Sequence, residues 1–230
     1  LIAIHKAYLE AGCHVINANT FGANGLKFDN VEEIITAGIQ LAKEAKKQAG
    51  CMDVYVALDI GPTGKLLEPM GDLPFEKAVS YFSQMVKAGV KAGADLILIE
   101  TMSDTYEAKA AVLAAKENSN LPVIVTMIFD ENQRLLTGGS VESAVAMLEG
   151  LRVDALGINC GSGPEQMLPV IKRIREVSSL PIIVNPNAGL PVQVNGKTVY
   201  DLKADDFAQA MVKIAQIGVQ GLGGCCGTTP

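Results

Sequence analysis

Short β-branched runs alternate with longer alanine-rich stretches along the whole chain. Each run ends in small or polar residues, and a stretch with helical character follows it. The pattern predicts strands at residues 15–19, 54–58, 96–99, 122–126, 155–159, 181–184 and 219–222. Strands and helices that alternate in this way are typical of a parallel α/β fold.

Proline and glycine mark the expected helix boundaries. Pro74 precedes Glu76 by two residues and Pro164 directly precedes Glu165, and a proline followed by an acid is usual in the first turn of a helix. Gly89 and Gly93 follow lysine- and alanine-rich stretches, so we expect helices to close on these glycines. Residues 1–11 predict a helix at the start of the chain.

Polar residues stand at the carboxyl end of nearly every predicted strand. An open doubly wound sheet uses mainly the strand ends beside its switch point, whereas a closed barrel gathers all of them around one mouth. The distribution therefore favours an α/β TIM-type (β/α)8 barrel. We expect residues 1–230 to be one barrel domain that lacks its first strand and last helix, as a fragment of a longer chain. The polar strand-end residues are Asn17, Asn19, Asp59, Glu100, Asp130, Cys160, Asn187, Cys225 and Cys226.

Composition and charge restrict the classes of function. Apolar residues make up 49% of the chain and charged residues 19%, which is enough to bury a sizeable core. The net charge of −6 argues against a nucleic-acid partner, because phosphate binding needs a basic surface. No apolar run approaches the roughly 20 residues that cross a bilayer. An odd count of five cysteines argues against a disulfide framework and for the reducing cytoplasm.

The stretch 223–227, Gly-Gly-Cys-Cys-Gly, carries the strongest chemical signal. Neighbouring side chains of a regular strand point to opposite faces, but the glycines allow a turn that brings both thiols to one side. Cys160 ends another strand, and three thiolates with one open position are a typical catalytic zinc site. Two alternatives remain: buried cysteines that act as small hydrophobic residues, and a vicinal disulfide between Cys225 and Cys226.

The other cysteines and the two histidines are assigned no chemistry. Cys13 and Cys51 precede strands, at the end of the barrel that serves stability. His5 lies on the opening helix and His14 at the start of a strand, where we expect packing or surface roles. With no further histidine in the chain, a Ser-His-Asp arrangement is excluded.

Six motifs resemble the homocysteine S-methyltransferases, in order along the whole chain. The most similar part of that family is the homocysteine-binding module of cobalamin-dependent methionine synthase. The final motif is the most specific, and a family strand with an Asp-Gly-rich motif would precede Leu1. The motifs lie at residues 19–24, 59–64, 100–102, 157–161, 186–189 and 223–230.

The resemblance implies a zinc-dependent methyltransferase. Cys160, Cys225 and Cys226 would hold zinc, and the homocysteine thiol would take the open position as a thiolate, because coordination lowers its pKa. Asn187 would be the fourth ligand when substrate is absent. Methionine would form by transfer of a methyl group from methylcobalamin, and cobalamin and folate modules would belong to the same polypeptide.

The resemblance also implies residues that hold the rest of the substrate. Glu100 ends an apolar strand, where its carboxylate would bind the ammonium group of homocysteine. The alternative is that Glu100 caps a helix or is an acidic residue at the rim of the core. Asn19, Thr20 and Asp59 lie at neighbouring strand ends and are expected to shape the pocket.

Three other functions remain open. A stand-alone homocysteine methyltransferase would take its methyl group from S-methylmethionine or betaine. A non-catalytic metal-binding barrel would have a closed set of four ligands, whereas three thiolates are visible. A metal-free barrel enzyme, such as an aldolase or isomerase, would need a reactive lysine or paired acids, and no lysine ends a predicted strand.

Overall fold

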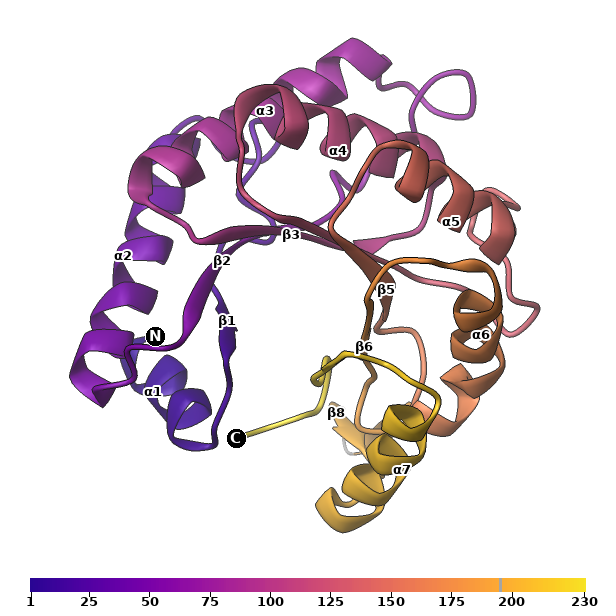
Figure 1. Cartoon of the computed structure of the whole chain (residues 1–230). Helices are drawn as coiled ribbons and strands as arrows, with labels where there is room; N and C mark the ends of the chain where they lie inside the picture. Colours follow the sequence, from indigo (N-terminus) through magenta and orange to yellow (C-terminus); the bar gives the residue numbers. More distant parts are fainter. Residues whose placement is uncertain (195) are drawn as a thin grey trace. The chain divides into compact units, whose positions relative to one another are not determined.

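A computed structural model describes residues 1–194 and 196–230 of the chain (Figure 1). It contains two compact units. The first comprises Leu1–Glu100 and Tyr106–Ile124 together with Pro230, and the second comprises Thr101–Thr105 and Val125–Thr229. The boundary passes through two strands, so each unit holds part of both.

The first unit alternates helices with parallel strands. Val15 of the first strand pairs with Tyr55 of the second, and Ala57 of the second pairs with Leu96 of the third. Helices α2, α3 and α4 lie on one side of these strands (Figure 1). The elements are α1 (Ile2–Glu10), β1 (Val15–Asn17), α2 (Val31–Ala49), β2 (Tyr55–Ile60), α3 (Phe75–Ala92), β3 (Leu96–Met102), α4 (Thr105–Asn118) and β4 (Val123–Met127).

Helix α3 shows why one expected helix end is wrong. The helix runs through Gly89 and ends on Gly93, which adopts the left-handed conformation of a C-cap with φ of 80°. A Cβ atom on Gly89 would lie 2.5 Å from a side-chain carbon of Leu58. Gly89 therefore allows α3 to approach β2 closely and does not end the helix.

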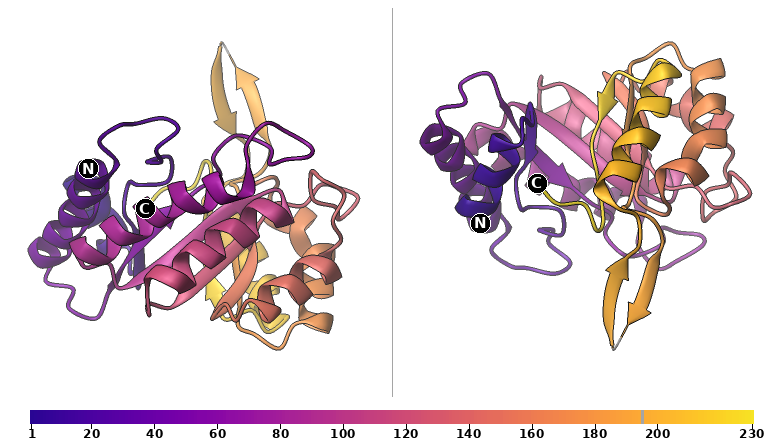
Figure 2. Two further views of the ribbon diagram at one scale, coloured as in Figure 1. Left: turned by 90° about the horizontal axis from the view of Figure 1, so that it is seen from above. Right: turned by 90° about the horizontal axis from the view of Figure 1, so that it is seen from below.

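The second unit continues the alternation and adds a hairpin. Strands β5, β6 and β9 pair in parallel, with Leu156 opposite Ile182 and Val184 opposite Leu222. The antiparallel hairpin of β7 and β8 was not expected from the sequence, and Figure 2 shows it projecting from the rest of its unit. The elements are α5 (Val141–Gly150), β5 (Ala155–Asn159), α6 (Pro164–Val177), β6 (Ile182–Asn185), β7 (Pro191–Val194), β8 (Lys197–Tyr200), α7 (Ala204–Gln216) and β9 (Gly221–Leu222).

The strand order follows the order along the chain, β1-β2-β3-β4-β5-β6-β9. All seven predicted strands are present, with small shifts at their ends. Sequential order with intervening helices is the topology of a TIM-type barrel. In the described part of the chain, α1 precedes β1 and no helix follows β9. This arrangement agrees with the expected barrel that lacks its first strand and its last helix. No described helix is long and apolar enough to cross a membrane.

Candidate metal centre

Three sulfur atoms lie together at the carboxyl ends of two strands in the second unit. The Sγ atoms of Cys160, Cys225 and Cys226 are all within 4.8 Å of one another. Cys226 Sγ is 3.9 Å from Cys160 Sγ and 4.0 Å from Cys225 Sγ. Tetrahedral zinc with Zn–S bonds of about 2.3 Å requires sulfurs about 3.8 Å apart. The three thiols therefore fit a zinc ion, and all three are free rather than disulfide-bonded.

The loop after β9 turns both neighbouring thiols to the same side. Gly227 has φ of 81°, a conformation that favours glycine. The backbone is fixed on both sides of the loop: Cys225 N–H donates to the Pro186 carbonyl at 2.8 Å, and Cys226 C=O accepts from Ala188 N–H at 2.9 Å. These bonds hold the Cys225 and Cys226 backbone without help from a metal.

Cys160 lies in a tight turn directly after β5. It has φ of 58°, which is uncommon for a residue with a side chain, and Gly161 follows with φ of 73°. Cys160 N–H donates to the Asn185 carbonyl at 3.0 Å, which anchors the turn to β6. The strained backbone is thus stabilised by its neighbours at the point where the candidate metal-ligating side chain begins.

The surroundings of Cys160 favour its thiolate. Hydrogen bonding with Cys225 is the main cause that lowers the pKa of Cys160 to about 5, and burial acts in the opposite direction. Further hydrogen bonds from the Gly161 backbone and from the Cys226 and Asn187 side chains also lower this pKa. A thiolate is the form that binds metal.

Asn159 connects the sulfur cluster to the strands, and the sequence alone did not identify this role. Its side chain is 1% exposed, and its Oδ1 atom accepts from Thr101 N–H at 2.9 Å and from the Thr126 hydroxyl at 2.8 Å. Its Nδ2 atom donates to the Thr101 hydroxyl at 2.8 Å and to Cys225 Sγ at 3.8 Å. The available signal was a polar residue at the end of an apolar strand, immediately before Cys160.

Tyr200 is a second residue that sequence reasoning missed. It ends β8, and its ring lies against Gly227, where an added Cβ atom would be 2.3 Å from Cγ of Tyr200. Burial is the main cause that raises the pKa of Tyr200. The sequence signal that could have found it is Asn-Gly at residues 195–196 between two short β-prone runs, a pattern typical of a β-hairpin.

The family model for homocysteine S-methyltransferase matches residues 1–230, the whole chain. The chain belongs to the homocysteine S-methyltransferase family. The expected resemblance is therefore confirmed at the level of the family.

Two curated relatives of this homocysteine S-methyltransferase chain are methionine synthases. Those of Mycobacterium leprae (strain TN) and Mycobacterium tuberculosis (strain ATCC 25618 / H37Rv) are each 32% identical to it over 244 residues. The alignments cover 100% of this chain and 20% of each relative, so the chain spans about a fifth of their length.

Solved structures confirm the predicted barrel fold. The apo form of the homocysteine methyltransferase MmuM from Escherichia coli has a TM-score of 0.80 and 25% identity, covering 100% of this chain and 81% of that one. The metallated form has a TM-score of 0.84 and 23% identity, and the match covers 100% of this chain and 80% of that one. At this identity the match supports the fold and nothing further.

The four expected substrate residues, Asn19, Thr20, Asp59 and Glu100, all lie in the first unit. Thr20 is buried, and its hydroxyl donates to the Asp59 carbonyl at 2.8 Å and accepts from Asp59 N–H at 3.1 Å. Thr20 therefore links the chain after β1 to β2. Glu100, in β3, is half-buried and Asn19 is exposed. Burial, and secondarily the charge of Glu100, raise the pKa of Asp59 well above its usual range.

Asn187 lies beside the cysteines, as the sequence predicted. It is buried, and its Oδ1 atom accepts from Cys226 N–H at 3.0 Å. Its backbone N–H donates to the Ser162 carbonyl at 3.1 Å, which fixes the position of the loop after β6. The side-chain oxygen proposed as a metal ligand is thus within the site but has a backbone partner in this structure.

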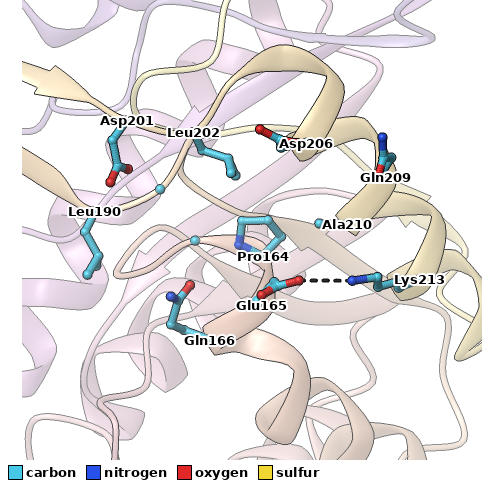
Figure 3. Close-up of a pocket in the computed structure, with 12 residues that line it drawn as sticks. Pro164, Glu165, Gln166, Leu190, Asp201, Leu202, Asp206, Gln209, Ala210 and Lys213 are labelled. Atoms are coloured by element: carbon cyan, nitrogen blue, oxygen red, sulfur yellow. Dashed lines mark hydrogen bonds and ion pairs between the residues drawn. The ribbon is translucent and has the colours of Figure 1, made fainter.

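A cleft of about 430 Å³ in the second unit is separate from the sulfur cluster. Figure 3 shows residues from the start of α6, the base of the hairpin and α7 around it, with an ion pair between Glu165 and Lys213 at 3.0 Å. None of the cysteines lines this cleft. The cleft is therefore distinct from the candidate metal ligands.

Proposed function

We propose that the chain binds homocysteine and activates its thiol at a zinc ion held by Cys160, Cys225 and Cys226. The observation that carries this proposal is the sulfur cluster, whose spacing of 3.9 and 4.0 Å is close to that of tetrahedral zinc ligands. Membership of the homocysteine S-methyltransferase family supports the choice of substrate. We propose that residues 1–230 work as one homocysteine-binding domain in the cytoplasm, where the thiols stay reduced.

Zinc at this site would stabilise the thiolate form of homocysteine, which is a stronger nucleophile than the thiol. The three cysteines would occupy three tetrahedral positions and leave the fourth for the substrate. The homocysteine sulfur would lose its proton to solvent and form a bond to the methyl carbon. The bond between the methyl group and its donor would break, and its electron pair would leave with the donor.

Asn187 is the proposed fourth ligand when substrate is absent. Its Oδ1 atom would then have to exchange the Cys226 N–H for the metal. Because the competing bond is a single neutral hydrogen bond of about 1 kcal/mol, this exchange is inexpensive. Displacement of the amide by homocysteine would return Oδ1 to the backbone N–H.

The other proposed substrate contacts come from the family resemblance. Glu100 would bind the ammonium group, and Asn19, Thr20 and Asp59 would shape the pocket. The structure gives Thr20 a structural partner, so its replacement is expected to affect stability as well as affinity. Glu100→Gln is the sharper test, because it keeps the shape and removes only the charge that the ammonium group needs.

Methylcobalamin is the proposed methyl donor, with cobalamin and folate modules in the same polypeptide as partners. The methionine synthase relatives support it, because this chain matches only 20% of their length. A stand-alone enzyme that uses S-methylmethionine or betaine is the second candidate. The similarity to the Escherichia coli homocysteine methyltransferase, of which the chain covers 81%, favours that alternative. Methionine formation with each of the three donors decides between them.

Zinc content under reducing conditions tests the proposal. The wild-type protein is expected to hold about one zinc per chain and Cys225→Ser far less, since a three-thiolate site needs all its sulfurs. Cys13→Ser is the matched control, because Cys13 lies in the first unit and has no assigned role. A folded wild-type protein that refuses added zinc would contradict the proposal.

Homocysteine binding then separates catalysis from metal storage. The thiol is expected to bind the zinc-loaded protein with release of about one proton, and methionine, which has no thiol, is expected to bind more weakly. A zinc-loaded protein that ignores homocysteine would indicate the non-catalytic metal-binding barrel.

A further inference from the structure

A buried acidic side chain joins the start of α4 to the loop after β2. Glu107 lies in the first turn of α4 and is 4% exposed. Its Oε1 atom accepts from the Thr63 backbone N–H at 2.7 Å and from the Thr63 hydroxyl at 2.5 Å. Thr63 is itself 3% exposed, and both residues belong to the first unit. Two donors of one residue therefore meet one carboxylate oxygen inside the protein, where hydrogen bonds to a charged group are strong.

The first turn of a helix favours acidic side chains, but this preference alone does not explain Glu107. An acid interacts with the helix dipole from an exposed position as well, whereas burial of a charged group is costly unless the group is hydrogen-bonded. Glu107 is buried and receives two hydrogen bonds from Thr63. Its position therefore indicates a role in holding the loop that contains Thr63.

Thr63 fixes the conformation of the loop formed by residues 61–64. Its hydroxyl also accepts from Lys65 N–H at 3.2 Å, across Gly64. Gly64 has φ of 84°, a conformation that favours glycine. The single residue Thr63 thus closes the turn on one side and contacts Glu107 on the other.

The same loop is bound to the chain after β1. Gly61 N–H donates to the Phe21 carbonyl at 2.8 Å, and a Cβ atom on Gly61 would lie 2.4 Å from Cε2 of the Phe21 ring. Thr20, which directly precedes Phe21, exchanges two hydrogen bonds with the backbone of Asp59. Residues 20–21 and 59–61 are therefore one hydrogen-bonded assembly, and Thr63 anchors it to α4.

This assembly carries a buried acceptor that is available to a ligand. Asp59 is 6% exposed, and its Oδ1 atom has no hydrogen-bond partner among the residues that the structure describes. An unpaired buried oxygen costs free energy unless a bound molecule supplies a donor. The ammonium group of homocysteine is such a donor. Because Asp59 lies two residues before Gly61, the direction of its side chain depends on the loop that Glu107 holds.

We propose that Glu107 is a positioning residue for homocysteine binding. It holds Thr63, and through this contact it keeps the loop of residues 61–64 and the Asp59 carboxyl group in the arrangement that receives the amino-acid part of the substrate. This inference rests on the proposed function, which assigns Asp59 to the homocysteine pocket. Glu107 itself touches neither the substrate nor the metal in this role.

Four substitutions test the contact. Glu107→Ala removes the acceptor, and Thr63→Val removes only the hydroxyl that donates to it. Thr63→Ser keeps both donors and is the conservative comparison. Asp95→Ala is the matched control, because the Asp95 side chain accepts from Val56 N–H at 2.8 Å near the amino end of β2, opposite the end that the loop follows.

Each variant is compared with the wild type in its stability, its zinc affinity and its affinity for two thiols. Urea unfolding gives the stability, and competition with a coloured chelator gives the zinc affinity. Calorimetry on the zinc-loaded protein gives the affinity for homocysteine and for 2-mercaptoethanol. The second thiol has neither an ammonium nor a carboxylate group, so its binding does not depend on the Asp59 carboxyl group.

Glu107→Ala is expected to weaken homocysteine binding about tenfold, since a loop that is in the competent arrangement only about a tenth of the time lowers the apparent affinity by that fraction. Thr63→Val should weaken it about threefold, because one of the two hydrogen bonds is lost, and Thr63→Ser should stay within about twofold of wild type. The affinities for zinc and for 2-mercaptoethanol should change by less than about twofold in all variants. Asp95→Ala should lose stability but bind homocysteine as the wild type does.

Two results would overturn the inference alone. If Glu107→Ala and Thr63→Val lose stability but bind homocysteine as tightly as the wild type, the contact is only structural. An equal loss of affinity for homocysteine and for 2-mercaptoethanol would show that the amino-acid part of the substrate is not involved. If Glu107→Ala does not fold, Thr63→Val against Thr63→Ser decides, because both leave the carboxylate in place. A zinc-loaded wild type that does not bind homocysteine would refute the proposed function together with this inference.

Discussion

Asn159→Asp should remove the hydrogen bond from residue 159 to the Cys225 sulfur while preserving the fold. The substitution keeps the shape of the side chain and the Oδ1 atom that accepts from Thr101 and Thr126. It removes the amide that donates to Cys225 Sγ at 3.8 Å. The Thr101 hydroxyl can rotate to donate to the new oxygen, but a thiolate sulfur cannot, because it has no proton.

The magnitude follows from that one lost bond. A hydrogen bond to a charged group contributes about 1.5–3 kcal/mol, and each 1.4 kcal/mol changes an equilibrium about tenfold. Zinc affinity is therefore expected to fall about 10- to 100-fold, which is also the range for the loss of a ligand's partner. The introduced carboxylate is buried, which raises its pKa, so the loss should be larger at pH 8 than at pH 6.

Thr126→Val provides the matched comparison. It removes a hydrogen bond accepted by Asn159 without changing the amide group that faces Cys225. We expect it to lower the free energy of unfolding by about 1 kcal/mol and to leave zinc affinity within about threefold of wild type. Urea unfolding and chelator competition measure both quantities. Equal zinc affinity in Asn159→Asp and wild type at pH 8 would refute the role of the amide.

Three further results are expected. In metal-free protein, alkylation of Cys160 should depend on pH with a midpoint near its pKa of about 5, whereas Cys13, whose pKa is raised by burial, should react only in alkaline solution. The raised pKa of Asp59 means that the folded state binds its proton more tightly, so stability should fall as the pH rises above ~4, by up to about 1.4 kcal/mol per pH unit, until the pH exceeds the folded-state pKa. Asp59→Asn should remove this slope in urea unfolding measured from pH ~4 upward. Gly157→Ala should prevent folding, as judged by circular dichroism, because the new Cβ would lie 1.8 Å from the backbone oxygen of Ile183.

The sequence predicted the barrel strands because each carries an unambiguous pattern. Runs such as 96–99 are entirely apolar, which is the mark of a parallel strand buried on both faces. Helix boundaries at Pro74 and Pro164 were likewise found where local chemistry defines them. Gly89 was misinterpreted because a glycine in a helix can serve close packing as well as termination, and only the position of Leu58 distinguishes the two.

The hairpin was missed for a different physical reason. Strands β7 and β8 are short and exposed, so neither has a buried face. The signal that the sequence did carry is Asn-Gly at residues 195–196, between the paired runs Pro191–Val194 and Lys197–Tyr200. Tyr200 could not be placed near the cysteines without that hairpin.

The cysteines could be predicted as a cluster because the barrel topology places strand ends together. The residue that supports them could not, since Asn159 contacts Cys225 through a side-chain direction that no spacing rule gives. Glycine spacing did indicate that the loop of Cys225 and Cys226 turns sharply, and the positive φ of Gly227 bears this out. Motif and topology thus identify candidate metal ligands, whereas their hydrogen-bond partners require coordinates.

The strained backbone at two positions explains why the sulfur cluster needs this polar support. Thr101 and Cys160 have φ of 67° and 58°, and such conformations cost about 1–3 kcal/mol each for residues with side chains. Thr101 N–H donates to the side chain of Asn159 in β5, and Cys160 N–H to the Asn185 carbonyl in β6, so both strained residues are fixed by hydrogen bonds to other strands. The sulfurs therefore take their positions from the fold itself. Zinc binding should then add stability by mass action without creating the structure, unlike small zinc domains that fold only with their metal.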